Sequence, residues 1–218
     1  MRTRFHRLAG VVRRGHTRKA RIAALAAVSL SLACHALPGA AQDREFVRAY
    51  ERAQAEKPAR VGSVSRIAPE NEPGTPLVIN GRVYQTDGRT PAPAGITVFA
   101  YQTDHTGVYD VPSAGAHSWR LKGWAVTDAE GRFTFHTIRP GSYPNATVPQ
   151  HVHLHLEGPD LPRRWTTSLQ FEDDPKLGAR EREASRRAGM FGGVRPVTKR
   201  DGIDHVEINL RIEDGGLF

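Results

Sequence analysis

The feature that most constrains this chain is a series of short apolar segments separated by turn signals, which runs from residue 77 to residue 212. Residues 132–138 and 151–156 alternate between two faces, as strands do. Asp87-Gly88 and Pro140-Gly141 mark turns between such segments. The expected strands are residues 77–84, 96–101, 124–127, 132–138, 151–156, 165–171 and 205–212. Short strands with frequent turns and little helix predict an all-β fold, a β-sandwich.

Four segments of different character organise the chain. Residues 1–41 are basic and then apolar. Within residues 42–76, a helix is expected at 43–57, with Phe46, Val47 and Tyr50 on one face, followed by a linker rich in Pro, Gly and Ser. Residues 77–218 form the predicted sandwich domain. Inside it, residues 173–200 are charged and lack strand periodicity, so they predict a long excursion, with a short helix at 179–188 as one possibility.

The formal charge of +8 suggests a nucleic-acid partner, but its distribution excludes one. Residues 1–41 hold eight of the 31 Lys and Arg residues and no acid. The other 23 basic residues balance the 23 acidic ones. The body of the chain is therefore neutral overall and offers no field that would attract a polyanion.

The basic leader reads as an export signal, and the expected location is the periplasm. Residues 22–33 are apolar but too few to span a bilayer comfortably, and a cut after Ala41 leaves small residues before it. Two variants stay open. The Arg13-Arg14 pair allows a twin-arginine signal, and Cys34 allows a lipid anchor, without which no membrane contact is expected. Because Cys34 is the only cysteine, the body has no disulfide and no thiolate ligand.

The histidines of residues 151–156 are the strongest local chemical signal. His151, His153 and His155 are two residues apart, so in a strand they project to one face. Imidazoles at this spacing can converge on one metal ion. An exposed histidine stripe without a metal is the alternative.

The surroundings of these histidines resemble the intradiol ring-cleavage dioxygenases, a family that includes catechol and protocatechuate dioxygenases. The resemblance covers residues 81–175. Its pieces, in the order of the family, are Gly81-Arg-Val-Tyr-Gln-Thr-Asp-Gly, Tyr101-Gln-Thr-Asp-His-Thr-Gly-Val-Tyr-Asp, Thr127-Asp-Ala-Glu-Gly-Arg-Phe-Thr-Phe-His-Thr-Ile-Arg-Pro-Gly-Ser-Tyr-Pro, His151-Val-His-Leu and Phe171-Glu-Asp-Asp-Pro. The fold that it implies is the prealbumin-like β-sandwich of that family.

The resemblance also implies a metal centre of one mononuclear non-haem Fe(III). Its ligands fall on Tyr109, Tyr143, His151 and His153. Phenolate oxygens favour Fe(III), and histidines complete the set. The implied substrates are a small aromatic diol and O2, and the ring opens between the two hydroxyl-bearing carbons. Tyr143 is also the implied catalytic residue, because the diol displaces it. His155 has no counterpart among the ligands and is expected further from the iron or exposed.

Two positions depart from the family. Val148 stands where an arginine commonly lies, and Ser168 stands where a glutamine is common. The missing cation predicts slower or altered cleavage unless Arg187 or Arg195 reaches the site.

Two rival interpretations stay open. One is a non-catalytic binding module, either transthyretin-like or a degenerate dioxygenase. The other is a cupin-type metal enzyme, because His151, His153 and Glu157 have that spacing.

Overall fold

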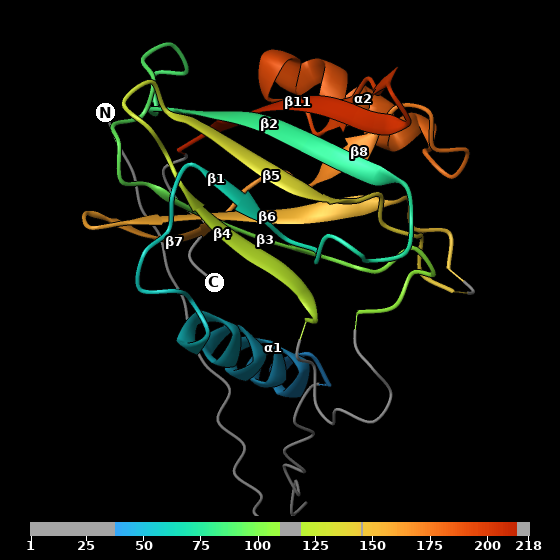
Figure 1. Ribbon diagram of the computed structural model, residues 1–218, viewed down its shortest axis with the longest axis horizontal. Helices are drawn as coiled ribbons and strands as arrows, with labels where there is room; N and C mark the ends of the chain where they lie inside the picture. The colour runs from blue at the N-terminus through green and yellow to red at the C-terminus, as the bar shows by residue number, and fades with distance from the viewer. Residues whose placement is uncertain (1–37, 110–118, 145, 213–218) are drawn as a thin grey trace, which may run out of the picture. The chain divides into compact units, whose positions relative to one another are not determined.

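The computed structural model describes residues 38–109, 119–144 and 146–212, and its elements belong to one unit, Leu37–Phe218. Two strand-rich layers dominate it (Figure 1). The elements in chain order are α1 (Pro38–Ala55), β1 (Val64–Arg66), β2 (Pro76–Tyr84), β3 (Thr97–Gln102), β4 (Leu121–Val126), β5 (Arg132–Ile138), β6 (His151–Gly158), β7 (Leu161–Trp165), β8 (Leu169–Phe171), α2 (Ala179–Ala188), the 3₁₀ turn η1 (Gly189–Phe191), β9 (Val194–Arg195), β10 (Thr198–Arg200) and β11 (Ile203–Arg211).

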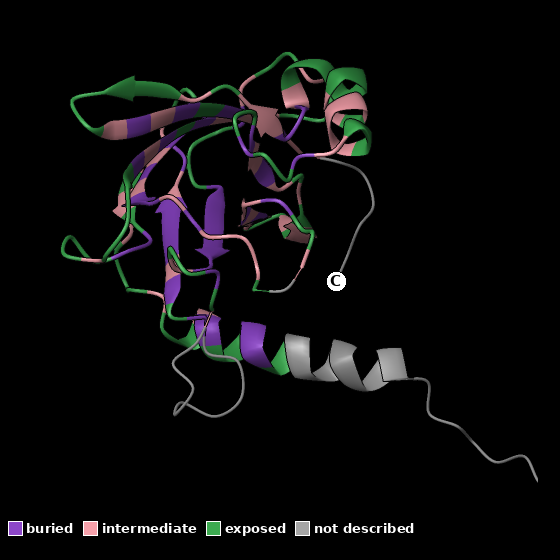
Figure 2. Cartoon of the chain, turned by 90° about the vertical axis from the view of Figure 1, so that its right-hand side faces the viewer, coloured by how far each residue is buried: buried purple, intermediate pink, exposed green. Residues whose placement is uncertain are grey.

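The layers are two sheets with a shared apolar core. The first sheet has the order β1-β5-β2-β11-β10, and the second has the order β4-β3-β6-β8-β9 with β7 paired to β6. Alternate residues of each strand face the core, among them Ile79 of β2, Phe135 of β5 and Leu154 of β6. In Figure 2, the buried residues, coloured purple, gather in the strands at the centre of the fold. This confirms the predicted β-sandwich.

A second apolar cluster lies on the outer face of the second sheet, where α1 covers it. Ala49, Tyr50 and Ala53 of α1 pack with Phe99 and other aromatic residues of this face. Strand β3 is consequently buried on both faces. The histidines of β6 project to this same outer face, because Val152 and Leu154 between them point into the core.

The expected elements differ from the observed ones in several places. The strand expected at 165–171 is interrupted, because β7 ends at Trp165 and β8 begins at Leu169. Strand β1 lies inside the expected linker and pairs with β5. Helix α1 spans Pro38–Ala55 instead of residues 43–57. Of the face expected for this helix, Tyr50 is buried together with Ala49 and Ala53, whereas Val47 is 41% exposed.

Residues 173–200 contain more regular structure than expected, including two short strands. They contain the helix expected at 179–188, then η1, β9 and β10. The expected export signal lies almost wholly outside the described residues. None of the described helices has the length and apolar character needed to cross a membrane.

Candidate metal centre

Four side chains meet in a closed ring of polar atoms on the outer face of the second sheet. Tyr109 Oη lies 2.6 Å from Tyr143 Oη, and Tyr143 Oη lies 3.0 Å from His151 Nε2. His151 Nε2 lies 3.0 Å from His153 Nε2, which lies 3.0 Å from Tyr109 Oη. The structure thus brings together all four residues that the sequence singles out as ligands.

Strand β6 supplies the two histidines. The alternation of a strand sends Val152 and Leu154 into the core and leaves His151 and His153 on the outer face. Tyr101 of β3 is paired with His153, and its ring stacks on the imidazole at a centroid distance of 4.5 Å. Trp119 stacks on the other side of Tyr101 at 4.2 Å. These aromatic neighbours fix the plane of His153.

The two tyrosines come from loops that touch through their backbones. The carbonyl of Asp104 accepts hydrogen bonds from the amides of Gly107 and Gly141, at 3.1 and 2.7 Å. A Cβ on Gly107 would lie 2.0 Å from the Ser142 carbonyl oxygen, and one on Gly141 would lie 2.5 Å from the Gly107 nitrogen. Both positions therefore need glycine for the loops to approach this closely.

A buried polar group supports the second of these loops. Gln102 is fully buried, and its Nε2 donates to the carbonyl of Ile138 at 2.8 Å. The Thr103 hydroxyl donates to the carbonyl of Gly141 at 2.7 Å. The end of β3 thereby holds the chain that leads from β5 to Tyr143.

Hydrogen bonds on the outer side of the imidazoles set their orientation. Nδ1 of His151 donates to the carbonyl of Pro149 at 2.8 Å, because a carbonyl can only accept. The neutral ring then presents a lone pair at Nε2 towards the other three atoms. Ser168 Oγ lies 3.4 Å from His153 Nδ1, on the side opposite the four-atom ring. Such partners are the usual means of orienting histidine ligands.

Burial keeps the four groups uncharged when no cation is present. It raises the pKa of Tyr109, and the hydrogen bond with Tyr143 raises it further. Burial also raises the pKa of Tyr143, against the opposing effect of the bond to Tyr109. It lowers the pKa of His151, and it lowers the pKa of His153 to about 3. Unprotonated imidazole is the form that binds metals, whereas the phenols need a nearby cation to ionise.

The donor set fits a ferric ion. The two phenol oxygens are hard ligands once a cation ionises them, and the two neutral imidazole nitrogens are intermediate ligands. Neighbouring atoms of the four are 2.6–3.0 Å apart, so all four can reach one ion. The described residues contain no metal-binding group of three or more His, Cys, Asp or Glu. The site has only two such residues, His151 and His153, and its other two donors are tyrosines.

Of the two places expected for His155, further from the iron or exposed, the structure supports the first. It is not exposed: only 1% of its surface is accessible, and it lies among the rings of Tyr50, Phe99 and Trp165. It is not part of the four-atom ring. Helix α1 accounts for this burial, because its Tyr50 packs against the ring of His155.

The cupin-like ligand arrangement is wrong for this fold. Glu157 accepts a hydrogen bond from Arg163 at 3.3 Å and forms an ion pair with Lys57 at 3.6 Å. It lies two positions beyond buried His155 on the strand, so it does not join His151 and His153.

The expected substitute cations lie elsewhere. Arg195 Nε donates to the carbonyl of Glu207 in the first sheet at 2.6 Å, and Arg187 pairs with Glu183 on its own helix at 3.8 Å. Val148, where the family resemblance expects arginine, is 39% exposed.

Several residues that shape this site are not predicted from the sequence. They are Tyr101, Gly107, Pro149 and Gln150. The turn sequence Asp104-His-Thr-Gly107 was a usable signal for the glycine. Tyr101 and Pro149 act through contacts that only the folded chain reveals.

Comparison with known proteins identifies relatives of this chain. The sequence model of a family described as "Dioxygenase" matches residues 54–193. The chain is 35% identical over 115 residues to the protocatechuate 3,4-dioxygenase beta chain of Burkholderia cepacia, covering 48% of each protein. It is 28% identical over 129 residues to catechol 1,2-dioxygenase 2 of Acinetobacter lwoffii, covering 52% of this chain and 46% of that protein. The chain spans about half the length of these curated relatives.

Solved structures show the same fold. The dioxygenase domain of a carbohydrate-binding fusion protein from Streptomyces sp. SirexAA-E matches 73% of this chain and 96% of its own, with a TM-score of 0.52 and 24% identity. Catechol 1,2-dioxygenase from Acinetobacter sp. ADP1 matches 79% of this chain and 69% of its own, with a TM-score of 0.54 and 17% identity. The chain belongs to the intradiol ring-cleavage dioxygenase family.

Proposed function

We propose that this protein is a non-haem Fe(III) dioxygenase that opens the ring of a small aromatic diol between its two hydroxyl-bearing carbons, using O2. The observation that carries the proposal is the ring of two phenol oxygens and two imidazole nitrogens, with neighbouring atoms 2.6–3.0 Å apart. Tyr109, Tyr143, His151 and His153 are the proposed ligands of one iron. Membership of the dioxygenase family supports this assignment.

The chain prepares these four groups in different ways. When bound, a ferric ion would supply the Lewis acidity that makes a diol reactive towards O2. His151 is held in one tautomer by Pro149, and His153 is held by the stacked ring of Tyr101. Both rings are therefore preorganised, so little orientational freedom is lost when the site is used.

Tyr143 is the proposed catalytic residue. It lies on the connection between β5 and β6 rather than in a strand, so a diol can replace it without breaking a sheet. Burial raises the pKa of its phenol. A displaced Tyr143 would therefore hold a proton firmly, which suits a group that accepts one from the incoming diol.

Metal analysis and the visible spectrum of the purified protein test this proposal. Phenolate bound to Fe(III) absorbs visible light, so iron-replete protein should be coloured and contain about one iron per chain. Tyr143→Phe should lose part of the absorption and bind iron more weakly. Tyr101→Phe is the matched control, because Tyr101 stacks on His153 but lies outside the four-atom ring.

The outcomes separate the proposal from its main rival. Unchanged iron content and colour in both Tyr143→Phe and His153→Ala would remove the ligand assignment. Iron-loaded protein that binds no diol and consumes no oxygen across a varied panel would leave a non-catalytic module on the dioxygenase fold.

A further inference from the structure

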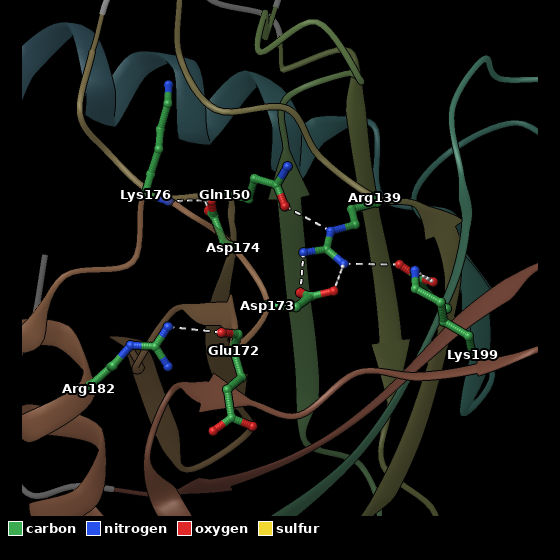
Figure 3. A network of polar contacts seen from close by, with 9 residues as sticks. Arg139, Gln150, Glu172, Asp173, Asp174, Lys176, Arg182 and Lys199 are labelled. Atoms are coloured by element: carbon green, nitrogen blue, oxygen red, sulfur yellow. Dashed lines mark hydrogen bonds and ion pairs between the residues drawn. The ribbon is translucent and has the colours of Figure 1, made fainter.

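The connection between β5 and β6, residues 140–149, carries Tyr143 and leads directly into His151. Arg139 and Gln150 flank it. Their side chains are hydrogen-bonded across the neck of the connection, with Arg139 Nε donating to Gln150 Oε1 at 2.8 Å (Figure 3). One side-chain contact therefore closes the loop on which a proposed iron ligand sits.

The arginine at this neck is held from several directions. Its guanidinium binds both carboxylate oxygens of Asp173, at 3.0 and 2.5 Å, and one oxygen of Asp204 at 3.1 Å. The guanidinium carbon lies 4.5 Å from the centroid of the Phe171 ring. The side chain is 14% exposed. A forked, partly buried pair of this kind has far less freedom than a surface lysine pair.

Gln150 is fixed on its other side as well. Its backbone amide donates to Asp174 Oδ2 at 2.6 Å, and Asp174 is buried. The preceding residue, Pro149, provides the carbonyl that orients His151. Any shift of Gln150 would therefore move both the backbone of His151 and the acceptor that fixes its imidazole.

We propose that Arg139 is a positioning residue, which sets the distance between Tyr143 Oη and His151 Nε2 by closing the neck of residues 140–149 through Gln150. The inference rests on the proposed function of the site as an iron centre. Arg139 touches none of the four ligand atoms, so it acts only through the two chain segments that it joins.

Four variants separate this role from general stabilisation. Arg139→Ala removes the neck contact together with the pairs to Asp173 and Asp204. Gln150→Ala removes the neck contact and leaves the pairs of Arg139 with Asp173 and Asp204. Gln150→Glu keeps an acceptor for Arg139. Lys199→Met is the matched control, because Lys199 donates to Asp204 at 2.7 Å in the same network and belongs to β10, away from the neck.

Two readouts are measured on each folded variant. Iron affinity should fall about 10- to 100-fold in Gln150→Ala and in Arg139→Ala, as it does when an outer partner of a ligand is lost. The visible band should shift with it, whereas Gln150→Glu and Lys199→Met should match the wild type. In the metal-free protein, ¹⁵N NMR of the histidines should show a changed His151 ring in Gln150→Ala and Arg139→Ala, and an unchanged ring in Gln150→Glu and Lys199→Met.

The second readout keeps the test independent of iron. Wild-type protein that binds no iron would end the proposed function, while the metal-free spectra would still decide whether Arg139 positions His151. A folded Gln150→Ala protein with a wild-type His151 signal would overturn the inference. So would a Lys199→Met protein that shows the same loss as Gln150→Ala, because the effect would then belong to the charge network as a whole.

Discussion

Gly107 and Ser142 meet where the two tyrosine-bearing loops cross: a Cβ on Gly107 would lie 2.0 Å from the Ser142 carbonyl oxygen. Gly107 also has φ +88°, in the left-handed region. The short distance between Tyr109 and Tyr143 therefore depends on the absence of a Cβ at Gly107.

Gly107→Ala should destabilise the protein by more than about 1 kcal/mol, because it adds backbone strain and a collision with a main-chain carbonyl. Urea unfolding measures the change. Gly202→Ala is the control, since Gly202 has φ +77° but nothing within 4 Å of its Cβ position. The control should lose less stability and keep its iron, whereas Gly107→Ala should bind iron more weakly. Equal losses in the two variants would mean that the loop contact is unimportant.

The ion pair between Asp173 and Arg139 should make stability depend on acidity. The hydrogen bond from Arg139 holds the pKa of Asp173 below its usual value. A carboxylate with a lowered folded-state pKa stabilises the fold above its unfolded pKa of about 4, and this contribution disappears as the pH falls through the folded-state pKa. Asp173→Asn should therefore cost about 0.2–1 kcal/mol at neutral pH, a range suited to a half-exposed pair, and almost nothing in strong acid.

Urea unfolding of the metal-free protein across this pH range provides the measurement. The same substitution in an Arg139→Gln background should show little pH dependence, because the partner that lowers the pKa is gone. A cost of Asp173→Asn that grows as the pH falls would contradict the assignment.

Much of this architecture follows from local pattern. The alternation of Arg132–Ile138 and the composition of Ala179–Ala188 predict β5 and α2 with their observed bounds. The break at residues 166–168 could not be read in this way, because all three are compatible with a strand. It coincides with a one-residue shift in the pairing with β6, since Trp165 lies opposite His155 but Leu169 lies opposite Val152.

The candidate site is likewise predicted only in part from the sequence. Strand periodicity predicts that His151 and His153 share a face, and the family resemblance supplies the two tyrosines. The burial of His155 depends on α1, and the sequence pattern of β6 does not predict that a helix packs on this face. The neck contact of Arg139 with Gln150 likewise joins residues that a sequence pattern does not pair.

Val148→Arg should raise turnover of the diol. Val148 is 39% exposed, so a longer side chain can be accommodated at little cost. A cation placed near the carbon where negative charge grows could contribute about 3 kcal/mol, or roughly a hundredfold in rate, if it resembles one preorganised donor. Initial rates measured beside Thr147→Arg, an exposed neighbour with the same added charge, check the effect. Equal rates in both variants and the wild type would show that the missing cation does not limit the reaction.

We propose that the protein is exported to the periplasm, and that the mature chain begins at Gln42. The basic leader followed by an apolar stretch supports this. Cell fractionation with N-terminal sequencing should find the shortened chain outside the cytoplasm, and Cys34→Ser should behave identically. Full-length protein retained in the cytoplasm would contradict export. Membrane-bound protein that Cys34→Ser releases would instead establish the lipid-anchored variant.

The most direct test of the proposed reaction is single-turnover mass spectrometry of the iron-loaded protein with an aromatic diol under ¹⁸O₂. Opening of the ring between the hydroxyl-bearing carbons turns both carbons into carboxylates, so the product should be a dicarboxylic acid that has gained two ¹⁸O atoms, with one O₂ consumed per diol. Tyr143→Phe should slow its formation, and Tyr101→Phe should change it far less. A quinone without ¹⁸O, or a product cleaved beside rather than between the hydroxyl-bearing carbons, would contradict the account.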